Sequence, residues 1–202
     1  MKKFLFLLPL LAIISCANNN NPLEAKFNER GCLECDNYEV GDTFVLNKKK
    51  MIVADSIILN AALSNGDDLT QFCVSHITNM RGMFWEATTF NQDIGNWDVS
   101  NVTDMAFMFL GATTFNQDIG SWDVSNVIYT DAMFLEATTF NQDIGNWDVS
   151  NVTDMDGMFS SADAFNQDLS QWCVSDISSM PRYFSHNSAL TLSNHPEWGT
   201  CP

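Results

Sequence analysis

A single phrase occurs four times in this chain at a fixed step of 25 residues. The copies begin at Phe90, Phe115, Phe140 and Phe165, and the first reads FNQDIGNWDVS. One repeat of this length cannot bury its own apolar side chains, so successive copies must stack on one another. The period therefore predicts a solenoid, an elongated stack of coils, over residues 67–184.

Apolar residues recur in columns at this step and mark the positions that face inward. Five coils result, and the first and last are the most divergent, as expected for coils that close the two ends. Two of the columns are aromatic: Phe72, Trp97, Trp122, Trp147 and Trp172; and Phe84, Phe109, Phe134, Phe159 and Phe184.

Each coil carries local signals for short elements. Residues 93–97 read as a strand that ends at Gly and Asn, and residues 102–105 as a second extended piece. Met105, Met108, Phe109 and Ala112 have helical spacing and predict about two turns of helix. The fold class expected is an α/β repeat solenoid with short parallel strands and one short helix per coil.

The repeats resemble the leucine-rich-repeat-like surface proteins of the BspA family. The residues that carry the resemblance are NQD(I/L)xxW, VSNVTDM and the Met-Phe pair of each coil, over residues 67–184. The resemblance implies a solenoid on a bacterial cell-surface or secreted protein, with adhesion or protein binding as its role. The third coil departs from the pattern, because Tyr129 replaces the acidic residue found at Asp104 and Asp154.

The first residues have the features of a processing signal. Two lysines precede an apolar run too short to span a bilayer, so residues 1–15 are expected to be a signal peptide. The run ends directly before Cys16 and resembles the bacterial lipobox, which implies lipidation of Cys16 and a membrane anchor in the cell envelope, at the outer membrane or cell surface. The alternative is an ordinary signal peptide with an incidental cysteine. Residues 16–30 read as a flexible tether.

The segments that flank the repeats predict two caps. Residues 31–66 contain a hairpin and a helix that begins after Asp55 and stops at Asn65-Gly66, which together form a small α+β N-terminal cap. Residues 185–202 are assigned to a C-terminal cap or tail.

Five cysteines remain after Cys16, and an exported protein keeps such residues mostly in disulfides. We favour a bond between Cys173 and Cys201, which would fix the C-terminal tail to the last coil. Cys32, Cys35 and Cys73 are candidates for a further bond, with their pairing open. Cys32 and Cys35 also form a C-x-x-C pattern, and the weakest hypothesis makes them a redox pair.

The formal net charge of −16 excludes nucleic acid as a partner and suits basic proteins or divalent cations. Stacked carboxylates carry part of this charge: Asp93, Asp118, Asp143 and Asp168. Such side chains can extend into solvent, accept backbone N–H groups in Asx turns, or bind calcium as a cofactor. The parallel column of Asn91, Asn116, Asn141 and Asn166 is expected to be buried and to satisfy backbone groups.

Catalysis has no support in the pattern, since no nucleophile–base set or phosphate loop occurs and the histidines lie at or beyond the edges of the repeats. We therefore expect a non-enzymatic lipoprotein whose repeats bind an extracellular or envelope protein. The alternatives are a structural envelope lipoprotein with calcium-binding acidic repeats, and a C-x-x-C redox lipoprotein.

Overall fold

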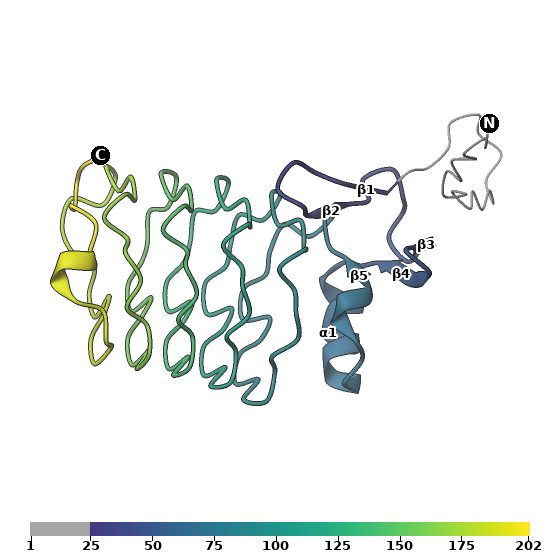
Figure 1. The fold of residues 1–202 in the computed structure, drawn as a ribbon, viewed down its shortest axis with the longest axis horizontal. Helices are drawn as coiled ribbons and strands as arrows, with labels where there is room; N and C mark the ends of the chain where they lie inside the picture. The colour runs from purple at the N-terminus through teal and green to yellow at the C-terminus, as the bar shows by residue number, and fades with distance from the viewer. Residues whose placement is uncertain (1–24) are drawn as a thin grey trace, which may run out of the picture.

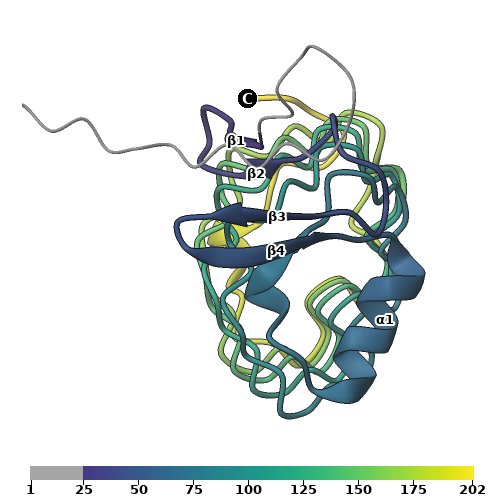
Figure 2. The same cartoon turned by 90° about the vertical axis from the view of Figure 1, so that its right-hand side faces the viewer.

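The computed structural model describes residues 25–202 and is an elongated row of coils with a small cap at one end (Figure 1). The predicted signal peptide, Cys16 and the first part of the predicted tether lie outside the described residues. Seen along the row, the coils superpose on one another and α1 and a hairpin cover the near end (Figure 2).

The described chain begins with a two-stranded antiparallel hairpin of β1 (Lys26–Phe27) and β2 (Leu33–Glu34). The N–H of Leu33 donates to the carbonyl oxygen of Asn96, and the Arg30 guanidinium lies 3.8 Å from the Asp123 carboxylate. The expectation of a flexible tether is thus wrong for residues 25–30, because backbone pairing and an ion pair fix this segment against the repeats.

The rest of the cap is a hairpin of β3 (Thr43–Leu46) and β4 (Lys49–Val53), with β5 (Phe72–Cys73) parallel to β4. Helix α1 spans Ser56–Asn65, and the carboxylate of Asp55 accepts from the N–H of Ile58 at 2.8 Å. Gly66 ends the helix with φ 75°, so both helix signals are confirmed. The helix buries Leu59 and Ala62 against the core of the first coil and so closes this end.

Two short 3-10 helices complete the elements, η1 (Leu69–Gln71) and η2 (Leu192–Asn194). Between β5 and η2 the coils contain neither a helix nor a strand of two or more residues. The predicted helix over Met105–Ala112 is wrong, because Phe107 and Gly111 have left-handed φ values of 59° and 69° that a right-handed helix excludes. Two successive tight turns produce the same inward spacing of side chains as a helix.

The strand predicted at residues 93–97 is also absent, since this segment forms a turn closed by the Trp97 N–H and the Ile94 carbonyl. The second extended piece is reduced to one bridging residue per coil: Asn79, Asp104, Tyr129 and Asp154 pair in parallel. The turns themselves carry most of the inter-coil hydrogen bonds. The N–H of Phe84 donates to the Met108 carbonyl at 2.8 Å, and that of Phe109 to the Met133 carbonyl at 2.9 Å.

The core between the coils is built from stacked aromatic rings. Phe109 lies 5.2 Å from Phe84 and 5.5 Å from Phe134 between ring centroids, with nearly parallel planes. A second column runs beside the first, and Phe109 and Phe115 of the same coil stack at 4.1 Å. These side chains are almost entirely buried, so each coil supplies apolar surface that its two neighbours cover.

The last coil departs from the 25-residue step. Left-handed residues recur at Gly82, Phe107, Ala132 and Gly157, but the next is Tyr183, 26 residues further on. The extra residue is Met180, which is exposed while Pro181 is buried. Phe184 therefore takes the hydrogen-bonding position of Met158 and meets Phe159 edge-on at 89°. The predicted inward-facing position of Phe184 is confirmed by its complete burial, but its ring is not parallel to the phenylalanine rings of the earlier coils.

Indole N–H groups link the tryptophan column across coils. Nε1 of Trp122 donates to the Ile94 carbonyl at 3.2 Å, and Trp147 and Trp172 make the equivalent bond one and two coils later. Trp97, in the first of these coils, has a buried Nε1 with no hydrogen-bond partner among the described residues. Tryptophan at the same position of the coil thus occurs both with and without an indole hydrogen bond, in nearly identical packing.

We expect Trp122→Phe to lower the free energy of unfolding by about 1 kcal/mol more than Trp97→Phe. Both variants lose the same ring volume, but only the first loses a hydrogen bond. Urea unfolding followed by circular dichroism measures the difference. Equal losses would contradict the role assigned to the indole ladder.

Two disulfides join the ends of the stack to its body. Cys173 pairs with Cys201, the bond favoured from sequence, and Cys35 pairs with Cys73. The N–H of Val174 donates to the Thr200 carbonyl, so residues 185–202 continue the last coil rather than form a separate tail. In the chain-entropy model, closing loops of this length stabilises the fold by about 3–4 kcal/mol each.

Candidate functional site

The carboxylates proposed as calcium ligands all accept backbone hydrogen bonds within their own turn. Oδ1 of Asp93, Asp118 and Asp143 accepts from the N–H two residues later at 3.0–3.2 Å. Asp168 accepts from the N–H of Ser170 at 2.9 Å, and this bond lowers the pKa of its carboxyl. The side chains are exposed Asx turns, and residues 25–202 contain no group of three or more His, Cys, Asp or Glu placed to hold a metal ion.

The asparagine column also bonds the backbone, but at the surface. Oδ1 of Asn91 accepts from the N–H of Asn116 in the next coil at 3.0 Å, and Asn116 and Asn141 repeat the contact. Asn91 and its equivalents are exposed, so the expectation of a buried column is wrong while its backbone role holds. These residues fix the spacing of the coils and leave little free hydrogen-bonding capacity for a ligand.

A different surface brings together unlike side chains from three coils. We define the aromatic–acidic cluster as Arg81, Trp85, Asp104, Phe107 and Asp131. The Arg81 guanidinium lies 4.5 Å from the centre of the Phe107 ring, 3.5 Å from Asp104 and 3.8 Å from Asp131. The Trp85 ring also stacks on the Phe107 ring, with 6.2 Å between the two ring centroids. The cluster spans three coils and holds Arg81 between aromatic and anionic groups.

Aromatic side chains in and beside the cluster are more exposed than is usual for a well-packed stack. Trp85 is 58% exposed, and Tyr129, which bridges to Asp104, is 45% exposed. Partial burial raises the pKa of the Asp131 carboxyl, and the neighbouring Asp154 charge adds to this while Arg81 opposes it. The surface therefore combines exposed rings with closely spaced carboxylates, an arrangement suited to contact with another macromolecule.

The cluster cannot be predicted from columns of like residues, because its members are unlike residues from three different coils. Trp85 stands where later coils have Leu110, Leu135 and Ser160, and Phe107 occupies a position that is Gly82 in the coil before. The detectable signal was the departure from the repeat: these residues are large and aromatic where the pattern does not require them. Tyr129 was recognised as such a departure.

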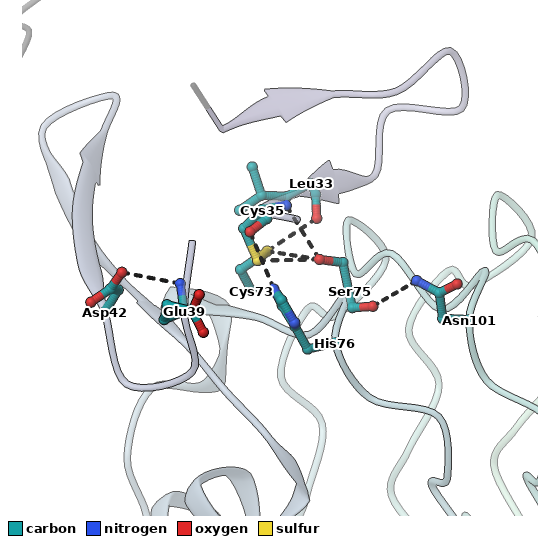
Figure 3. The surroundings of a disulfide bond; sticks show 8 residues. All are labelled: Leu33, Cys35, Glu39, Asp42, Cys73, Ser75, His76 and Asn101. Carbon is teal, nitrogen blue, oxygen red and sulfur yellow. Dashed lines mark hydrogen bonds between the residues drawn. A yellow bond between two sulfur atoms is a disulfide. The ribbon is translucent and has the colours of Figure 1, made fainter. Parts of the chain in front are cut away.

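The C-x-x-C redox hypothesis is not compatible with the disulfide arrangement. Cys35 bonds Cys73, and Figure 3 shows Ser75 beside this bond, with the N–H of Cys35 donating to the Ser75 hydroxyl at 3.3 Å. Cys32 is a free, buried cysteine, and burial raises the pKa of its thiol, which keeps it protonated and weakly nucleophilic. Cys32 and Cys35 therefore do not form a pair.

No helix among the described residues is long and apolar enough to cross a membrane. The cluster consists of two aromatic rings, one guanidinium and two carboxylates.

Hydrogen-bonded 25-residue coils with an aromatic core define this molecule as a stacked-repeat protein. The sequence profile of a family described as "Mycoplasma protein of unknown function, DUF285" matches residues 54–152 and 123–200. The chain belongs to this family. No curated protein and no solved structure matches the chain.

Proposed function

We propose that this protein is a lipid-anchored bacterial envelope protein whose repeat stack, of leucine-rich-repeat-like type, binds another protein through the aromatic–acidic cluster. The observation that carries the proposal is the exposure of Trp85, which stacks on the Phe107 ring that also contacts the Arg81 guanidinium. Tryptophan, tyrosine and arginine dominate the binding energy of protein interfaces. Their concentration on one surface supports recognition rather than a purely structural role.

Charge indicates the kind of partner. Arg81 is the only basic residue between residues 67 and 180, while Asp104, Asp131 and Asp154 lie around the cluster. The stack as a whole therefore attracts a basic surface at long range, and the exposed rings supply apolar contact once the surfaces meet. The partner expected is an extracellular or envelope protein with a basic, partly apolar face.

We expect Trp85→Ala to abolish retention of such a partner while Ile57→Ala has no effect. Ile57 is a matched control, since it is 76% exposed but lies on α1, away from the cluster. Captured extracellular and envelope proteins would be compared by quantitative mass spectrometry for the wild-type chain and the two variants. A partner retained equally by all three would contradict the assignment of the cluster as the binding surface.

The membrane anchor needs its own test, because Cys16 lies outside the described residues. We expect labelled palmitate to be incorporated into the wild-type chain and not into Cys16→Ser, with protease cleavage of the wild-type protein on intact cells. Absence of label in the wild type would remove the anchor from the proposal. It would leave the binding role of the cluster to be judged by the capture experiment alone.

A further inference from the structure

Each coil presents a row of backbone donors to the coil that follows. In the coil before the last, the N–H groups of Gly157, Phe159 and Ser161 donate to carbonyl oxygens of the last coil at 2.7–2.8 Å. The three earlier coils make the same contacts with their own successors. The first and third donors of each row belong to residues with left-handed φ, four positions apart, and the N–H of every second residue donates along the stack.

The last coil has the same row, and no following coil within residues 25–202 pairs with it. The N–H groups of Tyr183, Ser185 and Asn187 occupy the equivalent positions, since Tyr183 and Asn187 have φ values of 54° and 58°. None of the three donates to an acceptor within residues 25–202. We call them the terminal donor row. An open hollow of about 220 Å³ lies against it, lined by Tyr183, Ser185, His186 and two apolar neighbours.

The two ends of the stack are therefore unlike. At the first coil, α1 packs across the end, and a helix satisfies its own backbone groups. At the last coil, shown in yellow at the far end from α1 in Figure 1, the backbone edge carries unused donors beside Tyr183, which is 69% exposed. An unpaired edge of this kind is a template for pairing with another chain.

We propose that the terminal donor row binds an extended, acidic peptide segment of a partner protein, which adds to the stack as a further coil edge. Three observations favour this occupant. The same row binds three peptide carbonyls from alternate residues at every internal position, so peptide backbone fits it. Arg182 and His186 lie exposed next to the donors, which favours carboxylates over basic side chains. Tyr183 and the hollow provide apolar contact for alternate side chains.

This site is separate from the aromatic–acidic cluster and selects the opposite charge. A second copy of the chain is a poorer occupant, because its first coil is covered by α1 and its last coil offers donors only. Failure of the proposed function would not affect this proposal, because Trp85→Ala changes the aromatic–acidic cluster and leaves the last coil unchanged.

The probe is a peptide with the sequence DMDGMFSSAD, residues 154–163 of this chain. In the intact protein this segment supplies the carbonyls of Asp156, Met158 and Ser160 to the preceding donor row at 2.8–2.9 Å. The all-D peptide has the same charge and composition with a mirror-image backbone, and is the matched control. Amide hydrogen exchange of the whole isotope-labelled chain would be followed by NMR with each peptide.

In the free chain we expect the amides of Tyr183, Ser185 and Asn187 to exchange rapidly and those of Gly157, Phe159 and Ser161 slowly. The L-peptide slows exchange in the terminal donor row by about tenfold or more, and the all-D peptide does not. Arg182→Glu weakens binding of the L-peptide by about tenfold, whereas Arg30→Glu at the other end does not. Slow exchange at Gly157 and Phe159 verifies that each variant is folded.

Three results would overturn the proposal. The first is a terminal row that is already protected in the dilute free chain, since no open edge would then exist. The second is no slowing with the L-peptide at millimolar concentration, or equal slowing with both peptides. The third is protection that grows with protein concentration in the absence of peptide, which would assign the edge to a second copy.

Discussion

Gly120→Ala is expected to lower the free energy of unfolding by about 3 kcal/mol, near the upper end of overpacking costs. A β-carbon at Gly120 would lie 2.5 Å from the carbonyl oxygen of Asp143 in the next coil. That atom belongs to backbone held by the stack, so it cannot move aside as a flexible side chain would. The last copy has Ser170 at this position, where the neighbouring segment is the divergent η2.

Gly111→Ala is the matched control for Gly120→Ala. Gly111 has φ 69°, and its nearest neighbour to an added β-carbon is the Glu86 side chain at 3.5 Å. Its substitution should therefore cost only the left-handed backbone strain, about 1 kcal/mol. Urea unfolding of the three proteins gives the comparison. If Gly120→Ala cost no more than Gly111→Ala, the coils would not approach as closely as described.

Phe134→Ala is expected to cost about 3–5 kcal/mol, because it removes a ring from the middle of the aromatic core. Phe134 is fully buried and stacks on Phe109, Phe140 and Phe159, so its loss leaves a cavity bounded by three coils. Leu192→Ala is the control, since Leu192 is 81% exposed and its loss should change the free energy of unfolding by less than about 0.5 kcal/mol.

Thermal and urea unfolding both measure the effect of Phe134→Ala. A loss below that of an exposed substitution would mean that the rings do not form a continuous core. A loss in the expected range with intact binding through Trp85 would separate the two roles of aromatic residues in this protein. The buried rings hold the coils together, and the exposed ones are free to contact a partner.

The two proposed surfaces differ in charge. The aromatic–acidic cluster lies on the wall of the stack among carboxylates, and the terminal donor row lies at its end beside Arg182. The two proposals together predict that the stack binds two partners at once without competition. They also predict that a single substitution removes binding to either surface and leaves binding to the other unchanged.

The period, the inward-facing columns and the ends of helix α1 are all predictable from the order of residues along the chain. These follow from short-range rules: apolar residues at a fixed step must face a shared core, and Asp55 and Gly66 end a helix through their own backbone geometry. The favoured pairing of Cys173 and Cys201 is also the one that the structure has. The period and the columns depend on repetition, and the helix ends depend on residues close in sequence.

Only the tertiary structure decided how a coil closes and which exposed residues meet. A helix and two tight turns place the same side chains inward, and hydrogen bonds to the neighbouring coil select the turns, with Phe107 and Gly111 in left-handed conformations. The single extra residue at Met180 shifts the register of the last coil, and the N–H donors of that coil are unpaired because no following coil within residues 25–202 covers them. The cluster around Arg81 joins three coils through contacts that no periodic column contains, because inter-coil geometry brings unlike residues together.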